Sequence, residues 1–406
     1  MANTLITPTI IAQEMMLQVE NNLVFAKLVN RDYEDEFAKI GDTVQIRRPV
    51  KYNVRSGATM SVNDTEEGNI SLQLSNQKGV DFGFTSKDLT LTIDQFSDRY
   101  IKPAAIALAN QVEQDVSALA IKAANHVGTL GTQLTTFAGL AKGPQRLDEN
   151  AVPMDNRRIV LSPADYWGMV GSLSGLYIDP TAKQALVNGR LPMLGKMDVY
   201  ASQNTYAYTT GARGGTPQVN GANQNVTYAA SKASWTQTLL TKGWSNNITG
   251  VVKAGDIFTF TNVYDVNPAN KVATKNLKQF TVVSDANSDG SGLASLTITP
   301  PIITSGPQIN ASVAPTDSSN ITFLGSASTS YQPSIAFHRN AFALAIRPLD
   351  IPPGAHPQSK RITGEGLSLR MIPVYDGVND VSNFRFDILY GVKAVYPELA
   401  VRLSGT

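Results

Sequence analysis

The stretch from Gly214 to His338 contains neither arginine nor glutamate, and serine, threonine and asparagine dominate it. Its apolar residues come in short alternating runs, such as DIFTFTNVYDV, LKQFTVV and LASLTIT, which are separated by turn-forming stretches such as NPANK and SDANSDGSG. Alternation of apolar and polar residues is typical of half-buried strands, whereas Gly, Pro, Asn and Asp mark turns. The sequence therefore predicts a separate all-β module, a small barrel or sandwich, inserted into the rest of the chain.

The chain on both sides of this module predicts a mixture of helices and strands. Apolar residues recur at steps of three or four along residues 96–127, which indicates one helix about 43 Å long, ended by Gly128. A shorter apolar stripe from Ile11 to Ala26 predicts an N-terminal helix. Strand patterns return near the C-terminus in SIAFHRNAFALAIRPL, LRMIPVYDG and FRFDILYGVKAVYPELAVRL. The expected fold class is α+β.

Residues 42–88 alternate on both sides of a polar stretch, Ser56–Gly68, and predict a long two-stranded hairpin. Because a lone hairpin is marginally stable in water, we expect it to lie against another surface, such as a neighbouring chain. Its ascending arm carries four basic residues and its tip carries three acidic ones: Arg47, Arg48, Lys51 and Arg55, then Asp64, Glu66 and Glu67. Two interpretations remain open. The charges are either solvated faces, which contribute little, or contacts that set the register with a neighbouring subunit.

The stretch DANSDGSG places Asp285, Asn287, Asp289 and Gly290 at the spacing of the first half of a calcium-binding EF-hand loop. Position twelve of that loop requires a glutamate, but the chain has Leu296 there, and LASLTIT alternates like a strand. Asp, Asn, Ser and Gly are also the usual residues of turns. We therefore predict a hairpin turn, with Asp285 and Asp289 as candidates for contact with a neighbouring copy.

The residues that usually carry catalysis or bind metals form no recognisable pattern. The chain has no cysteine, and its three histidines, His126, His338 and His356, are far apart in sequence. The cluster GARGG at 211–215 lacks the spacing of a phosphate-binding loop, and we interpret it as a flexible hinge. We therefore expect no catalytic residue, metal or cofactor, and core or surface positions for the histidines.

Charge and hydropathy argue against further classes of protein. Lys and Arg number 34 and Asp and Glu number 33, so the net charge is +1, whereas dedicated nucleic-acid-binding proteins carry a clear basic excess. No run of about 18 apolar residues occurs, so we expect no membrane-spanning helix. The first residues, MANTLITPTIIAQEMM, show no pattern of a secretion signal.

The order of these predicted elements resembles the major capsid protein of tailed bacteriophages, which has the Hong Kong 97-type fold. LDENAVPMDNRRIVLSPADYWGMV resembles the segment that leaves a helix and enters the central sheet of the A-domain. VVKAGDIFTFTNVYDVNPANK, with LKQFTVVSD and LASLTITPPI, is similar to the inserted β-barrel of the Salmonella short-tailed-phage coat protein family. SIAFHRNAFALAIRPL resembles the segment that follows this insert, and FRFDILYGVKAVYPELAVRL resembles the closing strands of the P-domain.

The resemblance implies domain boundaries along nearly the whole chain. These are an N-terminal arm at 1–41, an E-loop hairpin at 42–88, the spine helix and P-domain at 89–135, the A-domain at 136–215, the inserted β-barrel at 216–332, the A-domain return at 333–372 and the C-terminal strands of the P-domain at 373–406. The implied function is self-assembly into pentamers and hexamers of an icosahedral head that encloses double-stranded DNA. Assembly is expected in the cytoplasm of the host bacterium, and the product in the virion capsid.

The resemblance also implies partners. These are further copies of the chain, a portal protein, DNA that is contacted without sequence readout, and a decoration protein as a further candidate. Some relatives carry an internal scaffold of about a hundred residues before the arm. Because the arm begins almost at Met1 here, we expect a separate scaffolding protein.

Two other functions remain as alternatives. A monomeric glycan-binding adhesin would use the β module, with Trp235, Trp244 and Tyr264 stacking on sugar, although such aromatic residues more often belong to a core. A hydrolase would need paired carboxylates, and the sequence shows no such motif. An elongated monomer at all concentrations would favour the adhesin, whereas icosahedral shells would establish the capsid protein.

Overall fold

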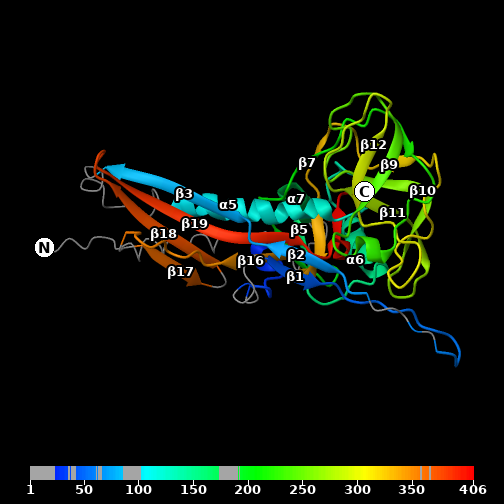
Figure 1. Ribbon diagram of the computed structural model, residues 1–406, viewed down its shortest axis with the longest axis horizontal. Helices are drawn as coiled ribbons and strands as arrows, with labels where there is room; N and C mark the ends of the chain where they lie inside the picture. The colour runs from blue at the N-terminus through cyan, green and yellow to red at the C-terminus, as the bar shows by residue number, and fades with distance from the viewer. Residues whose placement is uncertain are drawn as a thin grey trace. The chain divides into compact units, whose positions relative to one another are not determined.

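The structure of the protein is a computed structural model (Figure 1). It describes residues 23–34, 37, 43–60, 62, 66–85, 102–172, 191, 193–356, 359–364 and 367–406. The chain divides into two compact units. Unit 1 comprises Met1–Val44, Ser71–Ser117 and Ala343–Lys393, and unit 2 comprises Gln45–Ile70, Ala118–Phe342 and Ala394–Thr406. Within the described ranges, no helix is both long enough and apolar enough to cross a membrane.

The sheet of unit 1 takes its strands from distant parts of the sequence. Its order is β16 (Phe342–Arg347), β19 (Val381–Ala394), β18 (Leu367–Asp376) and β17 (Lys360–Gly364), and β3 (Asn76–Thr85) also pairs with β19. Strands β3 and β19 are antiparallel, with Thr85 opposite Val381 at one end and Asn76 opposite Tyr390 at the other. The rings of Phe82 and Phe386 stack 5.4 Å apart on this pair of strands, which fixes its register by aromatic packing.

A buried carboxylate joins the two helices described in unit 1. Glu113 lies on α5 (Lys102–Ser117) and reaches the start of the short helix α2 (Phe25–Leu28). Its two oxygens accept N–H bonds of 2.7–2.9 Å from the residues that begin α2: Val24, Phe25 and Ala26. The first N–H groups of a helix have no partner within the helix, so the carboxylate satisfies them, while its burial raises the pKa of Glu113. The predicted N-terminal helix from Ile11 lies mostly outside the described residues.

The helix predicted for residues 96–127 ends earlier than its apolar pattern indicates. A 3-10 helix (Ala118–Lys122) and strand β4 (Asn125–Val127) follow α5. The prediction is wrong beyond Ser117 because β4 pairs with β20 (Ala400–Leu403), and because the guanidinium of Arg402 binds backbone carbonyl groups of residues 121 and 123. Tertiary contacts of this kind override a helical apolar period. Residues 96–101 lie outside the described part of the chain.

The hairpin predicted for residues 42–88 is also shorter than expected. Strand β1 (Thr43–Arg47) pairs with β2 (Asn69–Gln73), and the arm, residues 48–68, connects them. The chain after β2 does not extend this hairpin, because β3 pairs with β19. The alternating pattern predicted both strands of NISLQLSNQKGVDFGFT correctly, but an alternating pattern carries no information on which strand is the partner.

The central sheet of unit 2 contains strands β4, β20, β15 (Ser334–His338), β5 (Arg157–Leu161) and β6 (Asp198–Ala201), in that order. Strand β15 runs antiparallel to both β20 and β5, so the strand that follows the inserted module lies in the middle of the sheet. Helices α6 (Phe137–Glu149) and α7 (Pro163–Ser172) pack on it over a buried core that includes Leu140, Ile159, Met169 and Val401. The last predicted strand run, FRFDILYGVKAVYPELAVRL, divides between the two units: β19 belongs to the sheet of unit 1, and β20 to this one.

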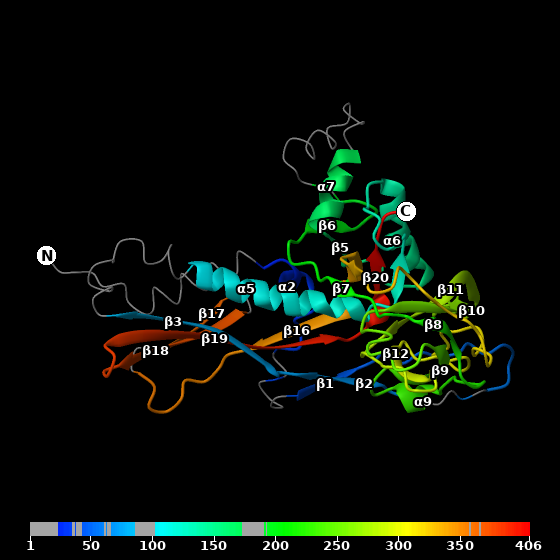
Figure 2. The same cartoon turned by 90° about the horizontal axis from the view of Figure 1, so that it is seen from above.

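The predicted all-β module is confirmed as a barrel-like sheet within unit 2 (Figure 2). Its strands are β8 (Gly215–Val219), β9 (Gln237–Trp244), β10 (Ile257–Val266), β11 (Ala273–Val282), β12 (Ala294–Thr299) and β13 (Ile321–Phe323), in the order β13-β10-β11-β12-β9-β8. A bridge between Gln218 and Asn320 brings the two edge strands together, so the sheet nearly closes. The inward-facing residues of its strands form one core: Val219, Leu239, Phe258, Phe260, Phe280 and Leu296.

Candidate assembly surfaces and the neck of the inserted domain

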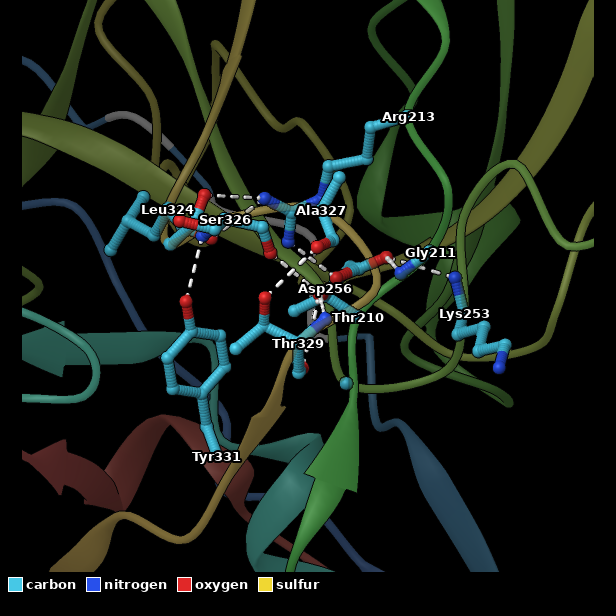
Figure 3. A network of polar contacts seen from close by, with 12 residues as sticks. Thr210, Gly211, Arg213, Lys253, Asp256, Leu324, Ser326, Ala327, Thr329 and Tyr331 are labelled. Carbon is cyan, nitrogen blue, oxygen red and sulfur yellow. Dashed lines mark hydrogen bonds and ion pairs between the residues drawn. The ribbon is translucent and has the colours of Figure 1, made fainter.

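Two chain segments join the inserted barrel to the rest of unit 2, and together they form its neck. Strand β7 (Tyr208–Thr209) pairs antiparallel with β14 (Ser330–Tyr331). Beyond them, the Thr210 hydroxyl donates to the carbonyl of Ser326 at 2.7 Å and accepts the N–H of Thr329 at 3.0 Å (Figure 3). The incoming and outgoing segments are therefore bonded to each other where the barrel begins.

The carboxylate of Asp256 completes the neck and is 0% exposed. Its oxygens accept the N–H groups of Gly211 at 3.0 Å and Lys253 at 2.9 Å, and an N–H of the Arg213 guanidinium at 2.6 Å. Another nitrogen of Arg213 donates to the backbone carbonyls of the outgoing segment, at residues 324 and 325. Figure 3 shows these groups converging on one point. A buried charge is tolerated only when it is paired and hydrogen-bonded, and here it is both.

The interpretation of GARGG as a flexible hinge is wrong. Two of its residues take part in the Asp256 network, so the segment is fixed by hydrogen bonds. A Cβ atom at Gly211 would lie only 2.4 Å from the carbonyl oxygen of Val251. Glycine is needed at this position because two backbone segments approach closely, and close approach leads to rigidity rather than flexibility.

Arg402 is a second buried residue that the sequence did not single out. Its side chain donates to the carbonyl groups of Ala123 at 2.8 Å, Gly255 at 2.8 Å and Ile121 at 2.6 Å, and to the hydroxyl of Thr281 at 2.9 Å. Burial lowers the pKa of Arg402. These contacts tie the last strand of the chain to the barrel. No sequence motif marks them, because most of the acceptors are backbone groups far away in sequence.

A third buried group, Asp265 on β10, joins the barrel to helix α6. It receives hydrogen bonds from Arg146 of α6 at 3.0 Å and from Lys278 of β11 at 2.9 Å. All three side chains are largely buried, so the network is shielded from solvent. The inserted domain is therefore held by charged contacts on two sides, at the neck and at α6.

The structure separates the basic residues predicted on the ascending side of the hairpin. Arg47 forms an exposed ion pair of 3.4 Å with Glu67, and Arg55 donates to the carbonyl of Gly57. Arg48 is 6% exposed and pairs with Glu398 inside its own chain, so its charge does not face a neighbour. Lys51 is half-buried, and its pKa is lowered to about 8, first by burial and then by neighbouring cationic groups.

Two of the acidic residues predicted at the tip, Glu66 and Glu67, lie near the base of the arm instead. Glu67 faces Arg47 at the base, and the charge of Glu66 acts on the nearby hydroxyl of Tyr228 in unit 2. Asp64 lies outside the described residues. Exposed apolar side chains occupy the outer part of the arm instead: Tyr52 (58%), Val54 (98%), Met60 (78%) and Val62 (76%). In the sequence these apolar residues lie among the charged ones, so the charge pattern hides them.

The stretch DANSDGSG forms the predicted turn between β11 and β12. Asp285 accepts the N–H of Ala254 at 2.8 Å, and Asn287 accepts the N–H of Gly250 at 2.7 Å. Asp289 accepts the N–H groups of two residues in its own turn, Ser291 and Leu293. These oxygens bind backbone donors, and the described part of the chain contains no cluster of three or more potential metal ligands from His, Cys, Asp and Glu.

The aromatic residues considered for sugar stacking do not form one surface. Trp244 is buried in the barrel core and donates its indole N–H to Thr241 at 2.8 Å, and Trp235 is also buried. Tyr264 is 38% exposed.

The histidine His126 is a core residue, and burial lowers its pKa to about 3, so it is neutral at physiological pH. His338 is buried as well.

Comparison with known proteins identifies the family. The family model described as "P22 coat protein - gene protein 5" matches residues 1–405. No match is found among curated protein sequences. A solved chain of Mycobacterium phage Che8 is 15% identical and has a TM-score of 0.51, with 95% of this chain and 92% of that chain covered. This similarity supports the fold.

Two further solved structures are similar at lower scores. One is "Asymmetric unit of bacteriophage PhiM1 mature capsid", at 9% identity and a TM-score of 0.47, covering 95% of this chain and 87% of that one. The other is "CUS-3 coat protein I-domain", at 24% identity and a TM-score of 0.20, covering 27% of this chain and 96% of that one. The chain therefore belongs to the P22 coat protein family and is a phage major capsid protein of the Hong Kong 97-type fold, a structural component of the virion shell that its copies form.

Proposed function

We propose that copies of this chain assemble into pentamers and hexamers, which close into an icosahedral head around the double-stranded DNA of a tailed bacteriophage. Rings of five and six copies need heterologous interfaces, in which two different surfaces of the subunit meet. An extended segment that leaves its own subunit and lies on the next one provides one side of such an interface. The arm at residues 48–68 has the properties of this segment.

The observation that carries this proposal is the exposure of the outer arm. Four apolar side chains stand out from a segment whose described residues beyond β1 and before β2 form no strand, and Val54 is 98% exposed. Each such side chain contributes about 1.5–3 kcal/mol when it is fully buried, so a neighbouring surface that covers them stabilises association. Exposed apolar patches of this kind mark interaction sites in soluble proteins.

The charge of the chain suits assembly in many copies. A net charge of +1 produces little repulsion between hundreds of subunits in one shell. We propose that packaged DNA meets scattered basic side chains through its phosphates alone, in a salt-sensitive contact without base readout. The role is structural rather than enzymatic.

We further propose the partners that such a head requires. A separate scaffolding protein directs assembly in the host cytoplasm, a portal protein occupies one vertex, and a decoration protein is a further candidate. Eight charged residues remain candidates for contact between subunits: Arg47, Lys51, Arg55, Asp64, Glu66, Glu67, Asp285 and Asp289. The Asp285→Ala, Asp289→Ala double variant tests the last two by shell yield. Its stability as a free subunit is measured in parallel, because both carboxylates also accept backbone N–H groups within the subunit.

Negative-stain electron microscopy of the full chain, co-expressed with its neighbouring genes, tests the proposal as a whole. We expect icosahedral shells with five- and six-fold rings. A chain that stays monomeric at every concentration in size-exclusion chromatography, and gives no shells, would contradict it.

A further inference from the structure

The base of the arm is enclosed by residues from two other parts of unit 2. Arg48 is the first residue after β1, and its guanidinium carbon lies 3.8 Å from the ring centroid of Trp235, in the inserted domain. The ring of Tyr396 lies 5.2 Å from the same carbon, and Glu398 forms an ion pair with the guanidinium. Arg48 is therefore held between the inserted domain and the C-terminal segment.

Hydrogen bonds of the backbone also fix the base of the arm. The N–H of Arg48 donates to the carbonyl of Gly68 at 2.7 Å, which joins the two ends of the arm. The hydroxyl of Tyr396 donates to the carbonyl of Arg47 at 2.7 Å. On the other side, the amide of Gln308, from the inserted domain, lies 3.5 Å from the carbonyl of Pro49. Both the side chain and the backbone of the arm base thus contact the inserted domain.

The side chains and backbone around Trp235 pack tightly, so the place of its ring determines the place of the arm base beside it. The ring of Tyr228, on helix α9 (Tyr228–Ser231), meets Trp235 edge-on at 6.2 Å. The carbonyl of Trp235 accepts a hydrogen bond of 2.9 Å from Thr299 at the end of β12. A Cβ atom at Gly68 would lie 2.5 Å from the Tyr228 hydroxyl, so the arm passes this helix as closely as a glycine allows.

Exposure changes along the arm, from buried side chains at the base to exposed ones farther out. From Tyr52 onward, the described side chains of the arm are mostly exposed. A segment that is buried at its base and exposed farther out takes its direction largely from the buried base. A desolvated cation–π contact stabilises this anchor, and an ion pair to the same guanidinium adds geometric constraint.

We propose that Arg48 and Trp235 form a latch by which the inserted domain sets the direction of the arm before assembly. The latch comprises Arg48, Trp235, Tyr396 and Glu398. Arg48 and Trp235 are positioning residues: they act on assembly through the placement of the outer arm and need no contact with the neighbouring subunit. This assigns the inserted domain a role within its own subunit, and it rests on the proposed function of the arm.

The absence of cysteine in the chain allows a direct test in the unassembled subunit. Cysteines are introduced at Val54 on the arm and at Val272 in the inserted domain, both well exposed, and they carry spin labels for distance measurement by pulsed electron paramagnetic resonance. We expect a narrow distance distribution in the parent. Arg48→Met, which keeps an unbranched apolar stem and removes the guanidinium with its charge, and Trp235→Leu should each lose the narrow peak. Arg48→Lys, which keeps the positive charge, should retain part of it.

Controls separate the latch from general damage. Trp167→Leu makes a similar change at an exposed tryptophan of α7, outside the latch, and should keep the narrow peak. Thermal unfolding confirms that each variant is folded. If Arg48→Met does not fold, Tyr396→Phe removes only the hydroxyl that binds the Arg47 carbonyl and should broaden the distribution by itself. The latch would be overturned by an unchanged narrow peak in the folded Arg48→Met and Trp235→Leu subunits. If Arg48→Met does not fold, an unchanged narrow peak in folded Tyr396→Phe would overturn it.

The distance measurement also separates the proposed latch from the proposed role of the arm in assembly. The distance distribution is measured in free subunits, so it reports on the latch whether or not shells form. The role of the arm in assembly is tested separately, by changing exposed residues of the outer arm that do not touch the latch.

Discussion

The guanidinium of Arg213 donates to the carboxylate of Asp256 over 2.6 Å, inside the neck that carries the inserted barrel. Both side chains are almost fully buried. Asp256 also binds the N–H of Gly211 on the incoming segment of the neck, and Arg213 binds carbonyl groups of the outgoing one. The inserted domain is therefore attached by a rigid, charged joint and not by a linker. This geometry fits a domain whose orientation relative to the arm base has to be fixed.

The Asp256→Asn variant tests this joint. It removes the negative charge and replaces one acceptor with a donor, so Arg213 is left buried without its counter-ion. Breaking a buried ion pair in this way costs about 3–5 kcal/mol of unfolding free energy. Urea denaturation of the free subunit measures the loss. Asp285→Asn is the matched control, because Asp285 lies in an exposed loop and accepts the N–H of Ala254. A similar loss in both variants would contradict the account.

Arg402→Met tests the contacts that tie β20 to the barrel. The substitution removes the guanidinium and leaves the buried carbonyl groups of Ala123 and Gly255 without this donor, whereas the carbonyl of Ile121 keeps its bond from Thr281. Each unsatisfied buried group costs about 1–3 kcal/mol, so we expect a loss of at least about 2 kcal/mol in unfolding free energy. The control is Arg361→Met, which removes an exposed ion pair with Asp350 and should cost less than about 1 kcal/mol. Equal stabilities of the two variants would argue against the role of Arg402.

The stability of the subunit should depend on pH through Lys51. Burial lowers its pKa in the folded state to about 8, from the ordinary value of 10.5. Between these two values the unfolded chain binds more protons than the folded one, so the contribution of Lys51 to stability rises with pH. Lys51→Met should therefore be more stable than the parent at pH 7, and this advantage should shrink as the pH approaches 10.5.

Chemical denaturation of both proteins across that pH range measures the difference. Lys275→Met, at an exposed lysine of β11, serves as the control and should change stability little. An advantage of Lys51→Met that stays constant with pH would show that lost packing or side-chain entropy, and not the charge, causes it.

Local patterns in the sequence were sufficient to predict the inserted barrel. Its strands alternate and its turns carry the residues that turns require, so DANSDGSG could be assigned to a turn as soon as Leu296 stood where a calcium loop needs glutamate. The order of elements also led to the right family. These features depend on neighbours in sequence, which a single chain displays directly.

The errors have a common physical cause, because each depends on a partner that is distant in sequence. The helix after Ser117 is lost to contacts with Arg402, and β3 leaves the predicted hairpin to pair with β19. Arg48 belongs to a basic run that reads as a solvated face, yet it is buried against Trp235 and Glu398. A sequence shows the charge of a residue but not which distant group will cover it.

Shell assembly by a variant of the outer arm tests the central claim most directly. Val54→Asp combined with Met60→Asp places two charges on side chains that are 98% and 78% exposed in the subunit, so folding should be unaffected. Val272→Asp makes the same change at an exposed valine of the inserted domain and serves as the control.

Sedimentation and electron microscopy then compare particle yields at matched expression. Because burying a charge at an interface is costly, the account predicts folded subunits and a loss of shells for the double arm variant, with normal yield for the control. Normal shells from the arm variant would contradict it.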